Sequence, residues 1–304
     1  MKKTIWFIVN PISGKSKKKN LEQQIIKYLD HGRFDYQYIF STHAGNLEEL
    51  AKEAIAKKID ILCVCGGDGS VHEAGKILKG TNVVLSIIPV GSGNGFARHF
   101  DIPLNVKNSI GLINNGNVIK VDTGTINNHV FLAFAGIAFD AKIANVYEGS
   151  KRRGFYRYAW LILRHYFFYK PIFIKGKNID EKNLMICSVT NISEFGYGMS
   201  FSPESFPADK KMELVCINQT PLYLILPMLL GFFQKKEIHS KRLKIIAFKE
   251  IRFKSNATLL QVDGETRYLK SDYIEIKVNE EQLHVLVDNK FKEMHNKELN
   301  ERLS

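Results

Sequence analysis

The sequence lacks any hydrophobic run long enough to cross a membrane. Its longest apolar stretch, from Pro221 to Phe233, covers about 13 residues and is interrupted by Pro227, whereas a transmembrane helix needs about 20. The apolar run Ile5–Val9 stops at Asn10-Pro11, which is too short for the hydrophobic region of a signal peptide. We therefore expect a soluble, cytoplasmic protein that is at most peripheral at the inner membrane surface.

Cysteine and acidic side chains are both scarce. The four cysteines, Cys63, Cys65, Cys187 and Cys216, are scattered through 304 residues, so we expect reduced thiols and neither a disulfide framework nor a paired-cysteine metal site. Lys and Arg number 43 against 31 Asp and Glu, which gives a formal net charge of +12. Such an excess favours an anionic partner, and nucleic acid, a phosphate-bearing ligand and an anionic membrane surface all qualify.

Short β-branched runs alternate with helical stretches in the first half of the chain, which is the pattern of βαβ units around a parallel sheet. Two of the helices carry capping-box signals, Asn46 with Glu49 and Ser70 with Glu73. The strands are expected at Ile5–Val9, Tyr36–Phe40, Ile61–Cys65 and Val83–Pro89, and the helices near Lys19–Asp30, Leu47–Lys57 and Val71–Leu78.

The pattern changes near Asp122, where short alternating segments begin that are separated by turn residues such as Asp263-Gly264. Such segments are typical of an antiparallel sheet. We therefore predict an α/β protein of two domains. Residues 1–125 form a parallel-sheet domain, and residues 126–304 form a mostly antiparallel, β-sandwich-like domain whose C-terminal segment can return to the first. The cleft between two domains is the default place for an active site.

Three glycine-bearing loops each follow a predicted strand of the first domain. Glycines allow backbone amides to approach a phosphate closely, and a helix N-terminus adds donors and partial positive charge. Because the carboxyl ends of parallel strands meet at one edge of a sheet, three such loops together predict a polyphosphate site. Neither the Walker A pattern nor the dinucleotide fingerprint is present. The residues assigned to the site are Asn10, Pro11, Ser13, Gly14, Lys15, Gly66, Gly67, Asp68, Gly69, Ser70, Gly91, Ser92, Gly93 and Asn94.

An acidic residue, Asp68, lies among these glycines. A carboxylate beside phosphates is electrostatically unfavourable unless it binds a metal ion or a proton. We therefore expect Asp68 to lie near a Mg²⁺ ion that bridges phosphate oxygens. A plainer interpretation, in which Asp68 only forms the turn between strand and helix, stays open.

The motifs around these loops resemble a known family. Asn10-Pro-x-Ser-Gly14, Gly66-Gly-Asp-Gly-Ser-Val-His-Glu73 and Pro89-x-Gly-Ser-Gly-Asn-x-Phe-Ala-Arg98 are similar to the three N-domain signatures of the diacylglycerol kinase/sphingosine kinase catalytic family, and Gly136–Ala141 and Val262–Glu265 continue the likeness. The resemblance covers nearly the whole chain. It implies an ATP- and Mg²⁺-dependent bacterial lipid kinase, with residues 1–125 as the ATP-binding domain and residues 126–304 as the lipid-binding domain.

The resemblance also implies roles for single residues. Glu265 matches the general base that accepts the proton of the lipid hydroxyl, and Asp140 matches an acid that contacts the substrate head group. Glu265 also follows Asp263-Gly264, which is the strongest short hairpin signal, so the alternative is an ordinary strand residue after a turn. Further positions implied to line the nucleotide are Thr42, His72 and Glu73.

The chain departs from the family pattern at several of these positions. Asp209 and Met212 occupy a stretch that helps hold a structural Mg²⁺ in some bacterial members. Lys210 replaces the glycine of that stretch and adds a positive charge to it. Ser70 replaces the usual threonine and keeps its hydroxyl, whereas His72 stands where many bacterial members have asparagine.

Two other functions share parts of this signature. NAD kinases have the Gly-Gly-Asp-Gly loop and a related two-domain fold, but the motifs Asn10–Gly14 and Gly91–Asn94 argue against them. A non-catalytic lipid-binding protein of the same fold is the other alternative, and the presence of Asp68 and Glu265 argues against it. Diacylglycerol, a sphingoid base or another lipid alcohol would all fit a similar site, so the substrate stays open at this point.

The segment Gly149–Ile179 contains no acidic residue and mixes basic with aromatic side chains. This composition fits docking to an anionic membrane. It also fits stacking on nucleic acid, or a helix that buries its aromatic side chains and leaves a solvated basic face. The partners that we expect are ATP, a lipid alcohol and, transiently, an anionic membrane surface. No nucleic acid is expected, and a homodimer stays open.

Overall fold

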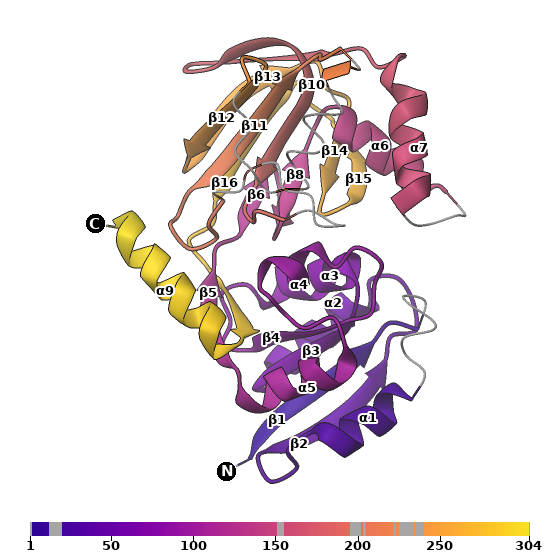
Figure 1. Ribbon diagram of the computed structural model, residues 1–304, viewed down its shortest axis with the longest axis vertical. Helices are drawn as coiled ribbons and strands as arrows, with labels where there is room; N and C mark the ends of the chain where they lie inside the picture. The colour runs from indigo at the N-terminus through magenta and orange to yellow at the C-terminus, as the bar shows by residue number, and fades with distance from the viewer. Residues whose placement is uncertain are drawn as a thin grey trace. The chain divides into compact units, whose positions relative to one another are not determined.

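The computed structural model describes residues 2–11, 20–150, 155–194, 202, 205–221, 223–224, 234 and 240–303. The chain divides into two compact units (Figure 1). Unit 1 consists of Met1–Thr123 together with Glu280–Ser304, and unit 2 consists of Gly124–Asn279. Both ends of the chain therefore contribute to the same unit.

Unit 1 is built on one sheet with the strand order β2-β1-β3-β4-β17-β5. The strands from β2 to β17 run parallel, and β5 is antiparallel to β17. The strands are β1 (Lys3–Val9), β2 (Phe34–Phe40), β3 (Ile61–Gly66), β4 (Val84–Pro89), β5 (Asn117–Val121) and β17 (Leu283–Val287). The helices are α1 (Leu21–Tyr28), α2 (Asn46–Ala56), α3 (Asp68–Leu78), α4 (Gly95–His99), α5 (Val106–Asn115) and α9 (Asn289–Leu303). The predicted parallel α/β architecture is confirmed for this unit.

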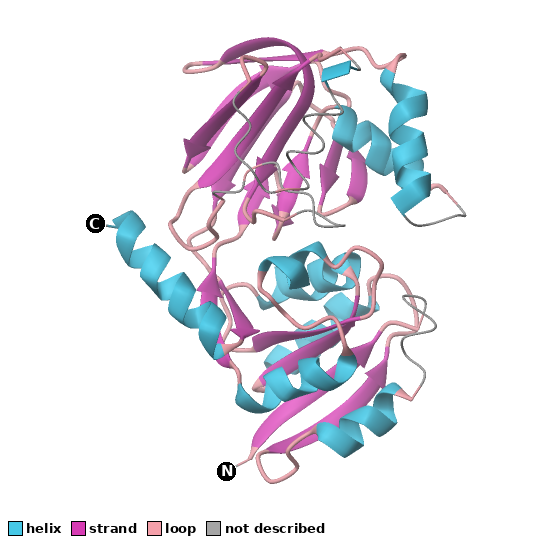
Figure 2. Cartoon of the chain, in the orientation of Figure 1, coloured by secondary structure: helices cyan, strands magenta, loops and turns pink. Residues whose placement is uncertain are grey.

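The central strands of this sheet are buried because helices cover both faces (Figure 2). Helices α1 and α5 contact each other, as do α2 and α3. Every residue of β3 is buried, which explains its continuous apolar sequence. The pairing register aligns Val9 with Cys65, and Gly66 with Pro89. The carboxyl ends of β1, β3 and β4 therefore lie side by side, and the glycine loops start from one edge of the sheet.

Two helices of unit 1 begin differently from the capping-box prediction, which is wrong at both positions. Helix α3 begins at Asp68 after Gly67, and helix α2 begins at Asn46 after Gly45, with no side-chain cap at either start. Gly45 has a φ of +84°, a conformation that glycine adopts without strain. The Asn46 side chain instead donates to Glu49 Oε2 at 2.8 Å, and the Ser70 side chain bonds to the first glycine loop, as described below.

Unit 2 is an antiparallel sheet with the order β15-β14-β8-β10-β9-β13-β16-β6-β7, and β11 pairs with β10 and β12. The predicted antiparallel, sandwich-like domain is confirmed. Its strands are β6 (Gly124–Ile126), β7 (His129–Phe131), β8 (Phe134–Gly136), β9 (Ile172–Gly176), β10 (Asp180–Thr190), β11 (Met212–Asn218), β12 (Leu243–Phe248), β13 (Glu250–Ser255), β14 (Leu259–Val262), β15 (Glu265–Tyr268) and β16 (Tyr273–Val278). Its helices include α6 (Phe139–Glu148) and α7 (Phe155–Tyr166).

Strand β10 curls this sheet because it pairs with different neighbours along its length. Its last residues, Ser188–Thr190, pair with β8 and β11, whereas its first part pairs with β9 across register shifts near Leu184. Such bulges bend a strand and increase its twist. Helix α6 packs on β10, β14 and β15, and helix α7 packs on α6. Within the described ranges, no helix combines the length and the apolar character needed to cross a membrane.

Candidate active site

The first two glycine loops of unit 1 are joined by a side-chain hydrogen bond. Asn10, directly after β1, donates through Nδ2 to the Ser70 hydroxyl at 3.1 Å. The backbone amide of Asn10 also donates to the Cys65 carbonyl at 3.4 Å. Ser70 is buried, and its hydroxyl links the two loops instead of capping the helix. Three further predicted residues of the first loop, Ser13, Gly14 and Lys15, lie outside the described residues.

The second and third loops meet backbone to backbone. A Cβ atom added at Gly91 would lie 2.5 Å from the Gly67 Cα atom, and one added at Gly66 would lie 2.5 Å from Ser70 Cβ. Only glycine fits at such approaches. A Cβ atom at Gly69, in contrast, would meet nothing within 4 Å. The first turn of α3 thus has open space beside Gly69, which is exposed.

The Asp68 side chain connects the second and third loops, and the Asn94 side chain holds the third loop together. Asp68 Oδ1 accepts a hydrogen bond from the Phe96 amide at 3.2 Å, so the carboxylate lies at the start of α4 as well as in the first turn of α3. Asn94 adopts a left-handed φ of +52° and donates through Nδ2 to the Gly91 carbonyl at 2.9 Å. The partial positive charge of a helix N-terminus favours a carboxylate at this position.

The remaining residues that are predicted to line the nucleotide differ in how deeply they are buried. Thr42 is exposed after β2, and its amide donates to Asn46 Oδ1 at 3.1 Å. His72 is buried within α3 and Glu73 is half-buried. Ser92 is exposed at the tip of the third loop, and the carbonyl of Gly93 accepts from Arg98 Nε at 3.1 Å. Pro11 is exposed beside Asn10.

In unit 2, Asp263 and Gly264 form the two-residue turn between β14 and β15, so the hairpin prediction is confirmed. Both residues have positive φ values, +48° and +91°, as a type I′ turn requires. The buried Asp263 carboxylate accepts hydrogen bonds from three backbone amides, from Leu132 at 2.7 Å and from Ala133 and Phe134 at 2.9 Å. The aspartate thereby ties the hairpin to the loop before β8.

Glu265 is the first residue of β15 and is half-buried. Its Oε2 atom lies 3.2 Å from Arg267, two residues along the same strand. The intervening Thr266 anchors the strand to α6, because its hydroxyl donates to Glu148 Oε2 at 2.6 Å and to Asn145 Oδ1 at 3.1 Å. The sequence interpretation missed Arg267 and Thr266, although residues two apart on a strand share a face and point to Arg267 as a partner.

Asp140 lies in the first turn of the same helix, α6. Its Oδ2 accepts from Ser188 at 2.9 Å and from Gln261 at 3.3 Å, and its Oδ1 accepts from the Ala138 amide at 3.2 Å. Burial raises the pKa of this carboxyl, and the hydrogen bonds lower it by less. A Cβ atom at Gly136 would lie 1.6 Å from Asp140 Oδ2, so the carboxylate fits only over a glycine. Helix α6 therefore connects Asp140 to the strand that carries Glu265.

The structural Mg²⁺ site at Asp209 and Met212 stays a prediction. Asp209 Oδ1 accepts the amide of Lys211 at 3.0 Å, and Met212 is buried at the start of β11. Lys210 adopts a left-handed φ of +60°, so the chain keeps the backbone form for which the family uses glycine. In the described part of the chain, no three His, Cys, Asp or Glu side chains are grouped closely enough to hold a metal ion.

Comparison with known proteins connects these motifs to one family. The family model described as "Diacylglycerol kinase catalytic domain" matches residues 4–126. The model described as "YegS C-terminal NAD kinase beta sandwich-like domain" matches residues 133–287. The chain belongs to the diacylglycerol kinase family. The resemblance drawn from the loops is confirmed, as is the assignment to an enzyme of the lipid kinase class.

Relatives of this family match over different lengths. A diacylglycerol kinase of Mycobacterium tuberculosis is 24% identical over 269 residues, which cover 85% of this chain and 87% of that protein. A diacylglycerol kinase of Staphylococcus aureus is 32% identical over 138 residues, which cover 44% of each chain. A crystal structure of a diacylglycerol kinase from Bacillus anthracis shares the fold, with a TM-score of 0.71 and 20% identity over 95% of this chain and 98% of that one.

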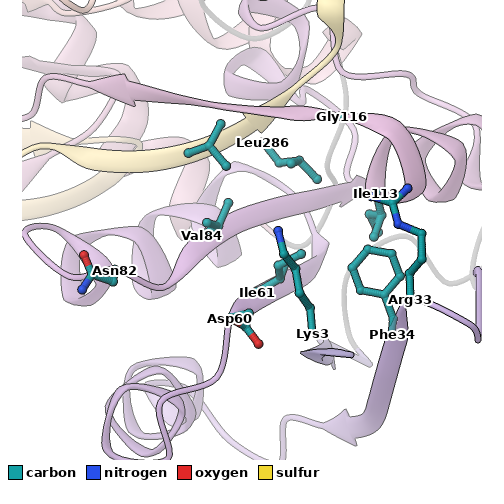
Figure 3. A pocket seen from close by; sticks show the side chains of 11 residues that line it. Lys3, Arg33, Phe34, Asp60, Ile61, Asn82, Val84, Ile113, Gly116 and Leu286 are labelled. Carbon is teal, nitrogen blue, oxygen red and sulfur yellow. The ribbon is translucent and has the colours of Figure 1, made fainter. Parts of the chain in front are cut away.

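A cavity of about 140 Å³ in unit 1 lies away from these family motifs. Its lining includes the first residues of four strands, namely Lys3, Phe34, Ile61 and Val84. Figure 3 shows the Lys3 side chain reaching in beside Ile61, with Arg33 and Phe34 at one side. The cavity is therefore at the amino edge of the sheet, opposite the glycine loops, and is not the phosphate site.

Proposed function

We propose that the chain transfers the terminal phosphoryl group of ATP to a hydroxyl of a lipid alcohol such as diacylglycerol or a sphingoid base. The observation that carries this proposal is the interlocking of the glycine loops at the carboxyl edge of the unit 1 sheet, where Gly67 meets Gly91 and Asp68 meets Phe96. Phosphoryl transfer needs positioning and charge neutralisation more than covalent chemistry. An edge of packed glycines and helix N-termini supplies both.

Unit 1 is the ATP-binding part in this proposal. Backbone amides at Gly67, Gly69 and Gly91 bind phosphate oxygens, and the exposed Thr42 and Ser92 lie at the rim of the same edge. Mg²⁺, when bound, neutralises charge on those oxygens. The Asp68 carboxylate fits a place in its coordination, because it is the acidic side chain that the fold positions among the glycines.

Unit 2 is the lipid-binding part. Glu265 accepts the proton of the lipid hydroxyl, and the neighbouring Arg267 holds its carboxylate in position. A positioned carboxylate of this kind contributes about 10²–10⁴-fold to the rate. Asp140 orients the head group from the other end of α6, whose Glu148 fixes the strand of Glu265 through Thr266.

The substrate also implies where the enzyme acts. A lipid alcohol resides in a bilayer, so the enzyme must meet a membrane surface, although the described helices do not cross one. The formal net charge of +12 favours attraction to anionic lipids. We therefore propose peripheral association with the inner membrane surface.

The decisive experiment combines radiolabelled ATP with a panel of lipid alcohols in mixed micelles and with NAD as a separate acceptor. The expected result is a labelled, organic-extractable product from one or more of the lipids, dependent on Mg²⁺, and no label in NAD. Label in NAD alone would establish the NAD kinase alternative. ATP binding without any labelled product from either acceptor would support the non-catalytic alternative.

A further inference from the structure

Helix α7 has apolar side chains on two opposite faces. One face is packed: Leu161 is buried in a cluster with Phe139, Ile143 and Met185, and Tyr158, Ile162 and Tyr166 contact that cluster. This packing holds α7 against α6 and β10 and accounts for half of its apolar sequence. The other half of the helix lies on the outer face.

The outer face carries a row of large exposed side chains. Tyr156 is 89% exposed, Trp160 45%, Leu163 55% and Phe167 68%. Tyr156, Trp160 and Leu163 are four and three residues apart, which places them on one side of α7, and Phe167 directly follows the last residue of the helix. We call these four residues the aromatic stripe. Contiguous apolar surface of this kind on a protein marks a place where another apolar phase or molecule binds.

Cationic side chains border the aromatic stripe. The guanidinium groups of Arg157 and Arg164 lie 4.7 Å and 5.1 Å from the centre of the Trp160 ring. Acidic residues are absent from the sequence between Gly149 and Ile179, while Lys170, Lys175 and Lys177 add further positive charge. Tryptophan and tyrosine flanked by arginine are typical of helices that lie in the headgroup region of a bilayer, where rings enter the acyl boundary and cations meet lipid phosphates.

We propose that the aromatic stripe inserts into the interface of an anionic lipid bilayer, with Arg157 and Arg164 at the level of the lipid phosphates. The proposal rests on the proposed function, since a kinase for membrane lipids must approach the bilayer that contains its substrate. A bilayer is favoured over a protein partner because the aromatic stripe lies within a basic, acid-free segment that complements an extended anionic surface. The packed face of α7 stays in place, so docking requires no unfolding.

Trp160 provides a direct reporter of this contact. The chain has two tryptophans, and the other, Trp6, is buried in the sheet of unit 1. In a Trp6→Phe background, the fluorescence of Trp160 should shift to shorter wavelength when vesicles of phosphatidylglycerol and phosphatidylcholine are added. Lipids brominated on the acyl chain should quench it. The shift should weaken with added salt, because charge attraction at the surface is screened within about 8 Å at physiological ionic strength.

Matched variants separate insertion from a general loss of structure. Leu163→Glu should reduce vesicle binding by about tenfold or more, since it places a charge where an apolar side chain enters the bilayer. Arg164→Glu should reduce it by about tenfold. The control is Ile26→Glu on α1, a helical apolar residue of unit 1 with 51% exposure, which should leave vesicle binding unchanged. All variants should keep their turnover of a short-chain lipid alcohol presented as monomers.

The outcomes distinguish this inference from the proposed function. Lipid phosphorylation on vesicles with an unshifted Trp160 spectrum, or with full activity in Leu163→Glu, would overturn the docking surface and leave the kinase intact. A shifted and quenched spectrum without phosphorylation of any lipid would support the surface and reject the kinase. Self-association in sedimentation that Leu163→Glu abolishes, with no binding to vesicles, would assign the aromatic stripe to a second copy of the chain instead.

Discussion

The dipeptide Asp-Gly occurs once in each unit, and the two copies adopt different structures. Asp68-Gly69 opens helix α3, and the Asp68 carboxylate reaches across to the Phe96 amide of another loop. Asp263-Gly264 closes a two-residue hairpin with both residues at positive φ. There the Asp263 carboxylate accepts hydrogen bonds from three backbone amides, those of Leu132, Ala133 and Phe134.

The strands that precede the two dipeptides explain the difference. Strand β3 lies in a parallel sheet, and a parallel neighbour cannot be reached in two residues, so the chain continues into a helix. Strand β14 has an antiparallel neighbour in β15, and a two-residue turn suffices. The same two residue types therefore form a tight turn in unit 2, whereas in unit 1 they leave open space beside Gly69.

The largest effect in this comparison is expected at Glu265, the residue that follows the second dipeptide. Glu265→Gln keeps the size of the side chain but cannot accept the proton of a lipid hydroxyl. We expect kcat to fall by about 10²–10⁴-fold, with the stabilisation by ATP unchanged, as measured by steady-state kinetics and thermal unfolding.

A matched control for Glu265 exists in the same sheet. Glu275 is exposed to the same degree, 33% against 34%, and also pairs with an arginine, Arg252. Glu275→Gln should keep near-native turnover. If both variants were equally slow, or if Glu265→Gln remained fast, Glu265 would be an ordinary strand residue after a hairpin.

A second pair of variants tests the two aspartates directly. Asp263→Asn should lower the free energy of unfolding by on the order of 3 kcal/mol, because three buried amides lose a charged acceptor. Asp68→Asn should lower it by about 1 kcal/mol or less, because the amide oxygen of the new side chain can still accept the hydrogen bond from the Phe96 amide. Urea titrations measure both. Asp68→Asn should also raise the Mg²⁺ concentration needed for half-maximal rate, and an unchanged Mg²⁺ dependence would remove Asp68 from the metal.

The smallest effects are expected from the two glycines, and their signs should be opposite. Gly264→Ala should cost about 1–2 kcal/mol of stability, because its φ of +91° disfavours a side chain. Gly69→Ala should add about 0.5–1 kcal/mol, because alanine suits a helix and the added Cβ meets nothing. The stabilisation by ATP should nevertheless shrink in Gly69→Ala. An ATP-induced increase in Tm equal to that of the wild type would place the phosphates elsewhere.

Much of the unit 1 framework could be predicted from the sequence. The apolar and β-branched runs predict β1, β2, β3 and β4 to within two residues, and the signal is clearest for the central strands, since buried parallel strands are apolar throughout. The Asp263-Gly264 hairpin was equally predictable, since its turn type demands those residues. Local chemistry decides both features, so the sequence alone was enough.

The links between distant segments could not be predicted in this way. Ser70 and Glu73 have the spacing of a capping box, yet the Ser70 hydroxyl accepts from Asn10, which lies 60 residues away in the sequence. The three amides that donate hydrogen bonds to Asp263 belong to Leu132, Ala133 and Phe134, which precede it in the sequence by 131, 130 and 129 positions. Likewise, the fit of Asp140 over Gly136 depends on how β8 and α6 meet. Such contacts depend on tertiary packing, which overrides local preference.

The position of β17 has a consequence for how the protein is made. This strand lies between β4 and β5, so Val121 pairs with Leu283 only after all of unit 2 has been synthesised. In the sequence, unit 2 is therefore an insertion between β5 and β17, and the place between β4 and β5 in the sheet stays empty until β17 emerges from the ribosome. Pairing across so long a separation is slow, and an unpaired strand edge is prone to aggregation. Unit 1 is thus the first part of the chain to be translated and the last to be completed.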